Sequence, residues 1–190
     1  MSRHTDTLPA SYFETKYQSD IDPWQFRTSD YEREKYAITL AALTRPHYPK
    51  ILEVGCSIGI FSAQLATRCD TLLAIDASAT ALDAARKNAP DNVVFEERTL
   101  PDGFPQGRFD LIVLSEVLYY FKTDDLNEVA RKCCEALAPG GEFLLCHWLG
   151  ETNYPLTGVE ASEGFAKAVA ERTPVRRILR DEVYRLERLS

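Results

Sequence analysis

Residues 51–61 read Ile51-Leu52-Glu53-Val54-Gly55-Cys56-Ser57-Ile58-Gly59-Ile60-Phe61, and this stretch decides the fold. An apolar run leads into two glycines, and an amphipathic helical pattern leads out of them. A strand that turns on glycine into a helix forms a seat for a nucleotide-like ligand, because backbone N–H groups point at the ligand there. The next apolar run ends in Asp76, whose carboxylate can accept hydrogen bonds from two ribose hydroxyls. The stretch therefore predicts a nucleoside-cofactor site.

Strand and helix patterns alternate between Lys50 and Cys146. The 109–114 segment is almost entirely apolar, as in a parallel strand that is buried on both faces. The alternation predicts an α/β fold with a Rossmann-like, doubly wound and mostly parallel sheet. The expected strands are 51–54, 71–75, 93–95, 109–114 and 142–146, and the expected helices are 58–68, 78–88 and one from Thr123 to the Pro139-Gly140-Gly141 turn.

Both ends of the chain depart from this alternation. Capping-box patterns at Ser29/Glu32 and Thr157/Glu160 predict helices that run to about Thr44 and about Arg172. Alternating segments at 175–179 and 183–189 predict a C-terminal antiparallel hairpin, on which the short cluster Arg176, Arg177 and Arg180 forms a solvated face. We expect a single domain over 1–190, with an N-terminal helical cap at 1–48 and a Rossmann-like core at 49–190.

Composition excludes several classes of function. The net charge of −7 argues against binding to a nucleic-acid backbone, which needs a basic surface. No apolar run is long enough to span a bilayer, and no apolar core follows the first residues as it would in a signal peptide, so we expect a cytoplasmic protein with no membrane partner. Five irregularly spaced cysteines without a CxxC motif are interpreted as reduced thiols, mostly in the core, with no metal site.

Glu53 decides which cofactor fits the predicted site. A dinucleotide site has the pattern G-x-G-x-x-G and brings a pyrophosphate close to the glycines. Here the third glycine is missing, and an acid two residues before Gly55 would repel a pyrophosphate. The acid suits a cofactor with a positive, hydrogen-bond-donating end, and S-adenosylmethionine (SAM) has an ammonium and a sulfonium there. An NAD-dependent oxidoreductase is therefore the less favoured alternative.

The pattern Glu53-x-Gly55-x-Ser57-x-Gly59 resembles motif I of the class I SAM-dependent methyltransferases, in which Ser57 stands where a second glycine is usual. A serine fits there if the backbone does not need a positive φ. The segment from Phe109 to Tyr120 resembles motif IV, and Thr99 occupies the place of an aspartate that binds adenine in many members. The resemblance implies a cofactor site formed by Glu53, Gly55, Cys56, Ser57, Gly59, Asp76, Ala77, Thr99, Leu100 and Ser115.

A narrower resemblance covers almost the whole chain. The prelude from Asp22 to Tyr36, the 114–120 segment and Cys146-His147-Trp148 are similar to the nodulation protein S (NodS) family. That family implies methyl transfer from SAM to the free amine of a de-N-acetylated chitooligosaccharide or another amino sugar, with S-adenosylhomocysteine (SAH) as the product. A monomer or homodimer is expected. O-methylation of a small metabolite and a non-catalytic SAM-binding module remain alternatives.

Four residues are candidates for the acceptor side of the reaction. Glu116, at the end of the fourth strand, is the first candidate to bind and deprotonate the amine, although it and Ser115 can instead line the methionine pocket. His147 is a second candidate for a base or sugar ligand, or else a structural hydrogen-bonding residue. Tyr119 and Trp148 can stack on a sugar ring or serve as packing.

The N-terminal segment is expected to fold over the cofactor. Trp24 and Tyr31 can close against SAM and the acceptor, since a sulfonium gains energy near an aromatic face. Arg33 can pair with the methionine carboxylate. The alternative is that this helix only packs on the sheet, which we favour for Tyr36 and Leu40.

Overall fold

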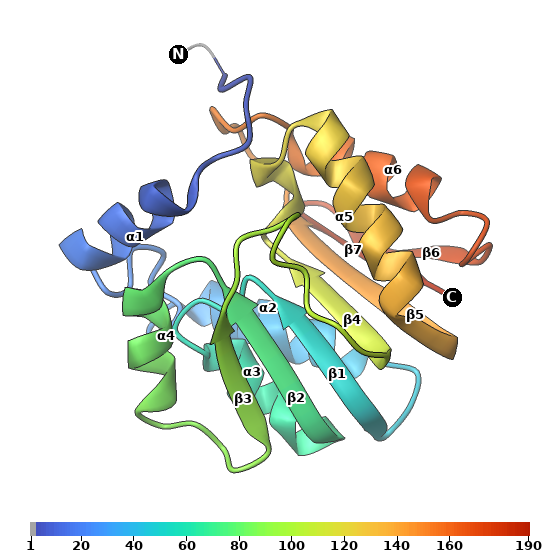
Figure 1. The fold of residues 1–190 in the computed structure, drawn as a ribbon, viewed down its shortest axis with the longest axis horizontal. Coiled ribbons are helices and arrows are strands. Elements are labelled where there is room, and N and C mark those ends of the chain that lie inside the picture. Colours follow the sequence, from blue (N-terminus) through green and yellow to red (C-terminus); the bar gives the residue numbers. More distant parts are fainter. Residues whose placement is uncertain (1–2) are drawn as a thin grey trace. The chain divides into compact units, whose positions relative to one another are not determined.

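The computed structural model describes residues 3–190, which form two compact units (Figure 1). The amino-terminal unit is Pro9–Thr99. The carboxy-terminal unit is Leu100–Ser190 together with residues 3–8.

Within Pro9–Thr99, three parallel strands lie in the order β3-β2-β1, and α2 and α3 lie behind them in Figure 1. The register pairs Val54 with Ile75, so the carboxyl ends of β1 and β2 lie side by side. This pairing brings the glycine turn next to Asp76, as the sequence predicts. The elements are α1 (Ala10–Ser19), α2 (Asp30–Ala41), β1 (Tyr48–Val54), α3 (Ile60–Leu65), a 3-10 turn (Ala66–Arg68), β2 (Cys69–Asp76), α4 (Ala79–Arg86) and β3 (Val93–Glu97).

Within Leu100–Ser190, the strands run in the order β4-β5-β7-β6. β4 and β5 are parallel, and β7 is antiparallel to both of its neighbours. The predicted C-terminal hairpin is thus confirmed, and its β7 pairs with β5. The elements are β4 (Phe109–Ser115), a 3-10 turn (Leu118–Tyr120), α5 (Thr123–Ala136), β5 (Leu137–Trp148), α6 (Gly158–Ala168), β6 (Arg176–Asp181) and β7 (Tyr184–Leu189).

Capping residues fix the starts of the helices as predicted, but their ends differ. Ser29 accepts a hydrogen bond from the Glu32 N–H, and Thr157 forms a complete capping box with Glu160. Two helices end earlier than predicted, at Ala41 and Ala168. The fifth strand was predicted to start at Glu142 but begins at Leu137, because the register between β4 and β5 shifts there and absorbs the Pro139-Gly140-Gly141 segment as an irregularity.

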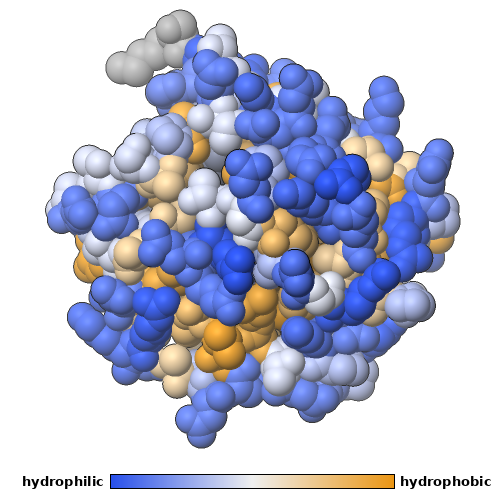
Figure 2. Space-filling model, viewed as in Figure 1, coloured by the Kyte–Doolittle hydropathy of each residue, from blue (hydrophilic) through white to orange (hydrophobic). Residues whose placement is uncertain are grey.

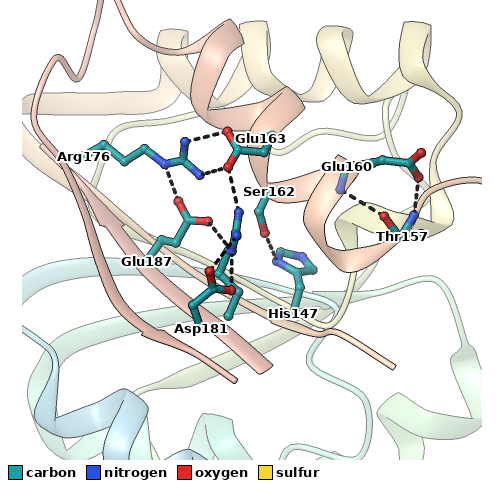
Figure 3. A network of polar contacts seen from close by, with 9 residues as sticks. His147, Thr157, Glu160, Ser162, Glu163, Arg176, Asp181 and Glu187 are labelled. Carbon is teal, nitrogen blue, oxygen red and sulfur yellow. Dashed lines mark hydrogen bonds and ion pairs between the residues drawn. The ribbon is translucent and has the colours of Figure 1, made fainter. Parts of the chain in front are cut away.

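An ionic network centred on a buried glutamate joins the hairpin to α6 (Figure 3). Arg176 donates to Glu187 at 2.6 Å and to Glu163 at 2.7 Å, and the Glu187 side chain is completely buried. Arg185 pairs with both Glu163 and Asp181. The prediction of a solvated basic face is therefore wrong for Arg176, whose acidic partners come from α6 and β7.

The surface is mainly hydrophilic on the face drawn in Figure 2, with hydrophobic residues between the polar ones.

All five cysteines are free thiols, and four of them are buried. Over residues 3–190, no helix has both the length and the apolar character required to cross a membrane. The same residues contain no cluster of three or more His, Cys, Asp or Glu side chains suited to a metal ion.

Candidate functional site

The glycine turn of the amino-terminal unit begins where β1 ends. Gly55 and Gly59 have φ values of 76° and 77°, which favour glycine. The N–H groups of Gly55 and Cys56 both donate to the Ile75 carbonyl, at 2.8 and 3.0 Å. A Cβ on Gly59 would lie 2.9 Å from the Ala85 Cβ, so only glycine allows α3 to start this close to α4. The turn is thereby held against the end of β2.

Ser57 differs from the sequence-based expectation. Its φ is 53°, so the backbone does need a left-handed residue at this position, and the condition set for a serine is not met. Two contacts hold the strained residue in place. Its N–H donates to Asp76 Oδ2 at 2.8 Å, and the Tyr17 hydroxyl donates to its Oγ at 2.5 Å. The turn, the end of β2 and helix α1 are joined through this one residue.

Asp76 lies at the end of β2, with its carboxylate oriented by the backbone. Oδ2 accepts the Ser57 N–H, and Oδ1 accepts the Ser78 N–H at 2.9 Å. Burial raises the pKa of Asp76, and these hydrogen bonds oppose the shift. Each carboxylate oxygen has two lone pairs, so a fixed carboxylate of this kind can still accept from a vicinal diol. Among the other predicted contacts, Ala77 follows Asp76 directly, Thr99 is exposed and Leu100 is buried.

Glu53 is buried at the end of β1 and accepts a hydrogen bond from the Ser62 hydroxyl at 2.5 Å. Burial raises its pKa to about 8, while the Ser62 hydrogen bond acts in the opposite direction. The carboxyl is therefore largely protonated at neutral pH. A cation placed near it would favour ionisation, whereas a phosphate would disfavour it. This environment fits a ligand with a positive end.

Helix α1, which the sequence did not predict, brings two further side chains to this site. Glu14 accepts from the Ser78 and Thr80 hydroxyls at 2.7 and 2.5 Å and from the Thr80 N–H at the start of α4. These hydrogen bonds lower the pKa of Glu14 to about 2. Burial raises the pKa of the Tyr17 hydroxyl well above its usual range. No local motif marks Glu14 or Tyr17, since their partners lie about 40 to 66 positions further along the chain.

Of the other predicted N-terminal residues, one lies near the glycine turn and one does not. Trp24 packs edge-to-face on Tyr17, with ring centroids 5.6 Å apart, in a cluster that includes Ile58 of the glycine turn. Arg33 instead points outward on α2, where its side chain is 71% exposed and pairs with Asp30. The buried cation of α2 is Lys35, which pairs with Glu32 and lies 5.4 Å from the centre of the Tyr31 ring.

In the carboxy-terminal unit, Glu116 follows β4 in a left-handed conformation with a φ of 55°. This conformation is costly for a glutamate and is typical of functional sites. Its N–H donates to the Cys146 carbonyl at 2.8 Å. Its Oε2 accepts from the Tyr119 hydroxyl and from the Trp148 N–H, both at 2.8 Å. The ends of β4 and β5 thus hold one carboxylate in a defined position.

Tyr119 is enclosed by other rings. Tyr154 stacks on it at 5.3 Å with an interplanar angle of 19°, and Tyr120 and His147 meet its ring edge-on. Burial raises the pKa of Tyr119 well above its usual range, and the Glu116 carboxylate adds to the shift. The ring has no open face for a sugar, so the geometry favours Tyr119 as a support for Glu116. Trp148, at 38% exposure, remains accessible.

His147 is fully buried, and both ring nitrogens face partners, of which Ser162 is drawn in Figure 3. Nε2 accepts the Leu118 N–H at 3.2 Å, so the ring proton must be on Nδ1, which faces the Ser162 hydroxyl at 3.4 Å. This arrangement supports the turn that carries Tyr119. The geometry favours a structural role for His147 over the predicted role as a base.

A sequence profile described as a methyltransferase domain matches residues 51–141. A provisionally assigned methyltransferase from Pseudomonas syringae, with a known crystal structure, is 37% identical, and the match covers 84% of this chain and 98% of that protein with a TM-score of 0.70. This chain belongs to the class I methyltransferase family.

Other proteins are similar over different extents. Nodulation protein S of Rhizobium tropici is 32% identical over 127 residues, which cover 65% of this chain and 53% of that protein. The chain thus spans about half the length of this relative. The crystal structure of the N-methyltransferase NodS from Bradyrhizobium japonicum WM9 in complex with SAH has a TM-score of 0.80 at 22% identity, with 96% of this chain covered. That likeness confirms the predicted class I methyltransferase fold.

Proposed function

We propose that this methyltransferase uses SAM to methylate an amine, most simply the free amino group of a de-N-acetylated chitooligosaccharide or another amino sugar. The buried Glu53 carboxyl behind the glycine turn carries the proposal, because its ionised form would pair with a cationic ligand and would repel a pyrophosphate. The relatives described as N-methyltransferase NodS and nodulation protein S support the choice of an amine. An O-methyltransferase acting on a small metabolite is the nearest alternative.

The residues of the amino-terminal unit fit SAM as a ligand. Asp76 would accept the ribose hydroxyls, since its carboxylate is held by the backbone at the end of β2. Gly55 and Gly59 have positive φ values, and they shape the turn that would face the cofactor. Glu53 would balance the positive methionine end. When bound, SAM supplies a methyl group on a sulfonium, which is activated for in-line displacement.

The carboxy-terminal unit would supply the acceptor side. Glu116 would accept a proton from the amine nitrogen, which must be neutral to act as a nucleophile. The Tyr119 hydroxyl and the Trp148 N–H would orient Glu116 without entering the reaction themselves. We further propose that 1–190 acts as one methyltransferase domain, because the match to the family profile, 51–141, runs through the Thr99–Leu100 division between the units.

Titration calorimetry of the purified protein with SAM, SAH and NADH side by side tests the cofactor. We expect micromolar binding of SAM and SAH alone, and binding of NADH in their place would overturn the proposal. Repeating the SAM titration near pH 7 in buffers of different ionisation enthalpy adds a second readout. Since the pKa of Glu53 is about 8 without ligand, pairing with a cation should release a proton.

A screen of amino sugars, including D-glucosamine and de-N-acetylated chitobiose, against their hydroxyl analogues then tests the acceptor. Glu116→Gln should lower kcat by about 10²-fold while leaving the SAH affinity nearly unchanged, if Glu116 accepts the proton. An unchanged kcat would reduce Glu116 to part of the pocket wall.

A further inference from the structure

The segment between β5 and α6, residues 149–157, contains no helix or strand and carries Tyr154. Besides the ring contacts of Tyr154, two backbone hydrogen bonds donated by the segment attach it to other parts of the unit. The Leu149 N–H donates to the Val183 carbonyl at 2.9 Å, and the Leu156 N–H donates to the Tyr119 carbonyl at 3.2 Å. A loop of this kind has a low free energy of local opening unless other contacts hold it.

Residues 3–8 supply those contacts and are called the strap below. Arg3 donates to the Tyr154 carbonyl at 3.1 Å and to the Pro155 carbonyl at 2.6 Å. The same guanidinium pairs with Glu160 at 2.6 Å. The His4 N–H donates to the Asn153 carbonyl at 2.8 Å. Three consecutive carbonyls of the loop are thus bound by the strap, and a planar guanidinium is suited to bridging two of them and a carboxylate.

The other end of the strap is fixed close to Tyr120. The Leu8 N–H donates to the Tyr120 carbonyl at 2.9 Å, and the Leu8 side chain is buried. The Thr7 hydroxyl donates to Asp125 at 2.5 Å and accepts the Lys122 N–H at 3.0 Å. The strap therefore joins the start of α5 to the loop.

A chain of contacts links the strap to Glu116. The strap holds the loop, Tyr154 of the loop stacks on Tyr119, and Tyr119 donates to the Glu116 carboxylate. Tyr120 meets Tyr154 edge-on at 4.7 Å. A carboxylate beside clustered tyrosine rings is a chemical environment that selects organic amines and ammonium groups.

We propose that the strap and the 149–157 loop form the acceptor-specificity element of the enzyme, with Arg3 as a positioning residue and Tyr154 as a specificity-determining residue. The identity of the acceptor rests on the proposed function. The mechanical part, in which the strap holds the 149–157 loop in position, does not. The strap sets the position of Tyr154, and Tyr154 limits the space and orientation available to an amine at Glu116.

Hydrogen exchange on the full chain tests the mechanical part without any substrate. Arg3→Ala should increase amide exchange in 149–157, and at Tyr119 and Tyr120, on the order of tenfold. Arg131→Ala removes an exposed arginine that pairs with Glu128 and Glu135 within α5, so it is the matched control and should leave these amides unchanged. Unchanged exchange in Arg3→Ala would overturn the strap.

Kinetics with D-glucosamine and de-N-acetylated chitobiose test the specificity part. Arg3→Ala and Tyr154→Leu should each raise the acceptor KM about fivefold or more and alter the preference between the two amines, with SAH affinity unchanged. Arg3→Lys should restore only part of the wild-type behaviour, because an ammonium cannot replace the planar set of N–H donors of the guanidinium. Wild-type acceptor KM and preference in both variants would overturn the proposal. If the wild-type protein binds SAM but methylates no amine, the proposed acceptor class fails while the exchange result still decides the strap.

Discussion

The glycine turn of the amino-terminal unit and the Glu116 turn of the carboxy-terminal unit meet the same backbone requirement in different ways. Each follows a parallel strand and contains at least one residue with positive φ. Glycines satisfy the requirement at Gly55 and Gly59. At Glu116 a glutamate does so at a cost of about 1–3 kcal/mol, which contacts from Tyr119 and Trp148 must offset. The first turn is specified mainly by its own glycines and needs tertiary contacts at Ser57, whereas the second turn has no glycine and depends on tertiary contacts throughout.

If the carboxy-terminal unit depends on distant contacts, removal of one buried charge there should have the largest effect on stability. Glu187→Ala leaves Arg176 without its buried partner and should lower the free energy of unfolding by about 3–5 kcal/mol. Urea unfolding monitored by circular dichroism measures this. Glu135→Ala, on the exposed face of α5, is the control and should change it by less than about 1 kcal/mol. Equal effects of the two substitutions would contradict this interpretation of the network.

In the amino-terminal unit, the corresponding substitution should mainly affect binding. Asp76→Ala removes the acceptor for the ribose hydroxyls and should weaken SAH binding by about 1.5–3 kcal/mol, which calorimetry detects as a rise in Kd. Asp83→Ala, an exposed acid of α4 that pairs with Arg86, should leave the Kd unchanged. A normal Kd for Asp76→Ala would show that the second-strand acid does not bind the cofactor.

The two turns also explain what could be predicted from the sequence. The sequence predicts the alternation of strands and helices and the cofactor side of the site, which contains Glu53, the glycines and Asp76. These residues are brought together by strand pairing alone, which places Val54 next to Ile75. The pairing of Tyr119 with Glu116 and the two hydrogen-bond partners of His147 could not be predicted, because they depend on side-chain orientation in the folded unit.

The contacts of helix α1 could not be predicted from the sequence for a related reason. Helix α1 has no side-chain cap and only a weak amphipathic pattern, so the local sequence does not predict it. Its Glu14 gains its role only when it lies at the start of α4. The positive φ of Ser57 was missed because a serine gives no sign of left-handed backbone, and the compensating Tyr17 hydroxyl lies 40 positions earlier.

A change of pH should separate Glu14 from ordinary surface acids. Its folded pKa of about 2 lies below the usual 4.5, so its ionised form stabilises the folded state above pH 4.5, and this stability is lost as the pH falls towards 2. Glu14→Gln should therefore cost about 1 kcal/mol at pH 7 and less at pH 3. Urea unfolding at both pH values checks this, with Glu34→Gln on the exposed side of α2 as the control. An equal loss at both pH values would contradict the role of the ionised carboxylate.

The smallest effect is expected where the sequence-based hypothesis and the structure differ most. Arg33 was expected to pair with the methionine carboxylate, but its side chain is largely exposed and pairs with Asp30 one turn earlier in α2. Because this exposed side chain pairs within its own helix, Arg33→Ala should change the Kd for SAH by less than about threefold, and loss of the pair should cost only about 0.2–0.5 kcal/mol of helix stability. Arg86→Ala, which removes a similar exposed i,i+3 pair from α4, provides the baseline. A loss comparable to that of Asp76→Ala would mean that Arg33 turns inward when the ligand binds, and that the N-terminal cap, like the Glu116 turn, acquires its function from contacts that its own sequence does not specify.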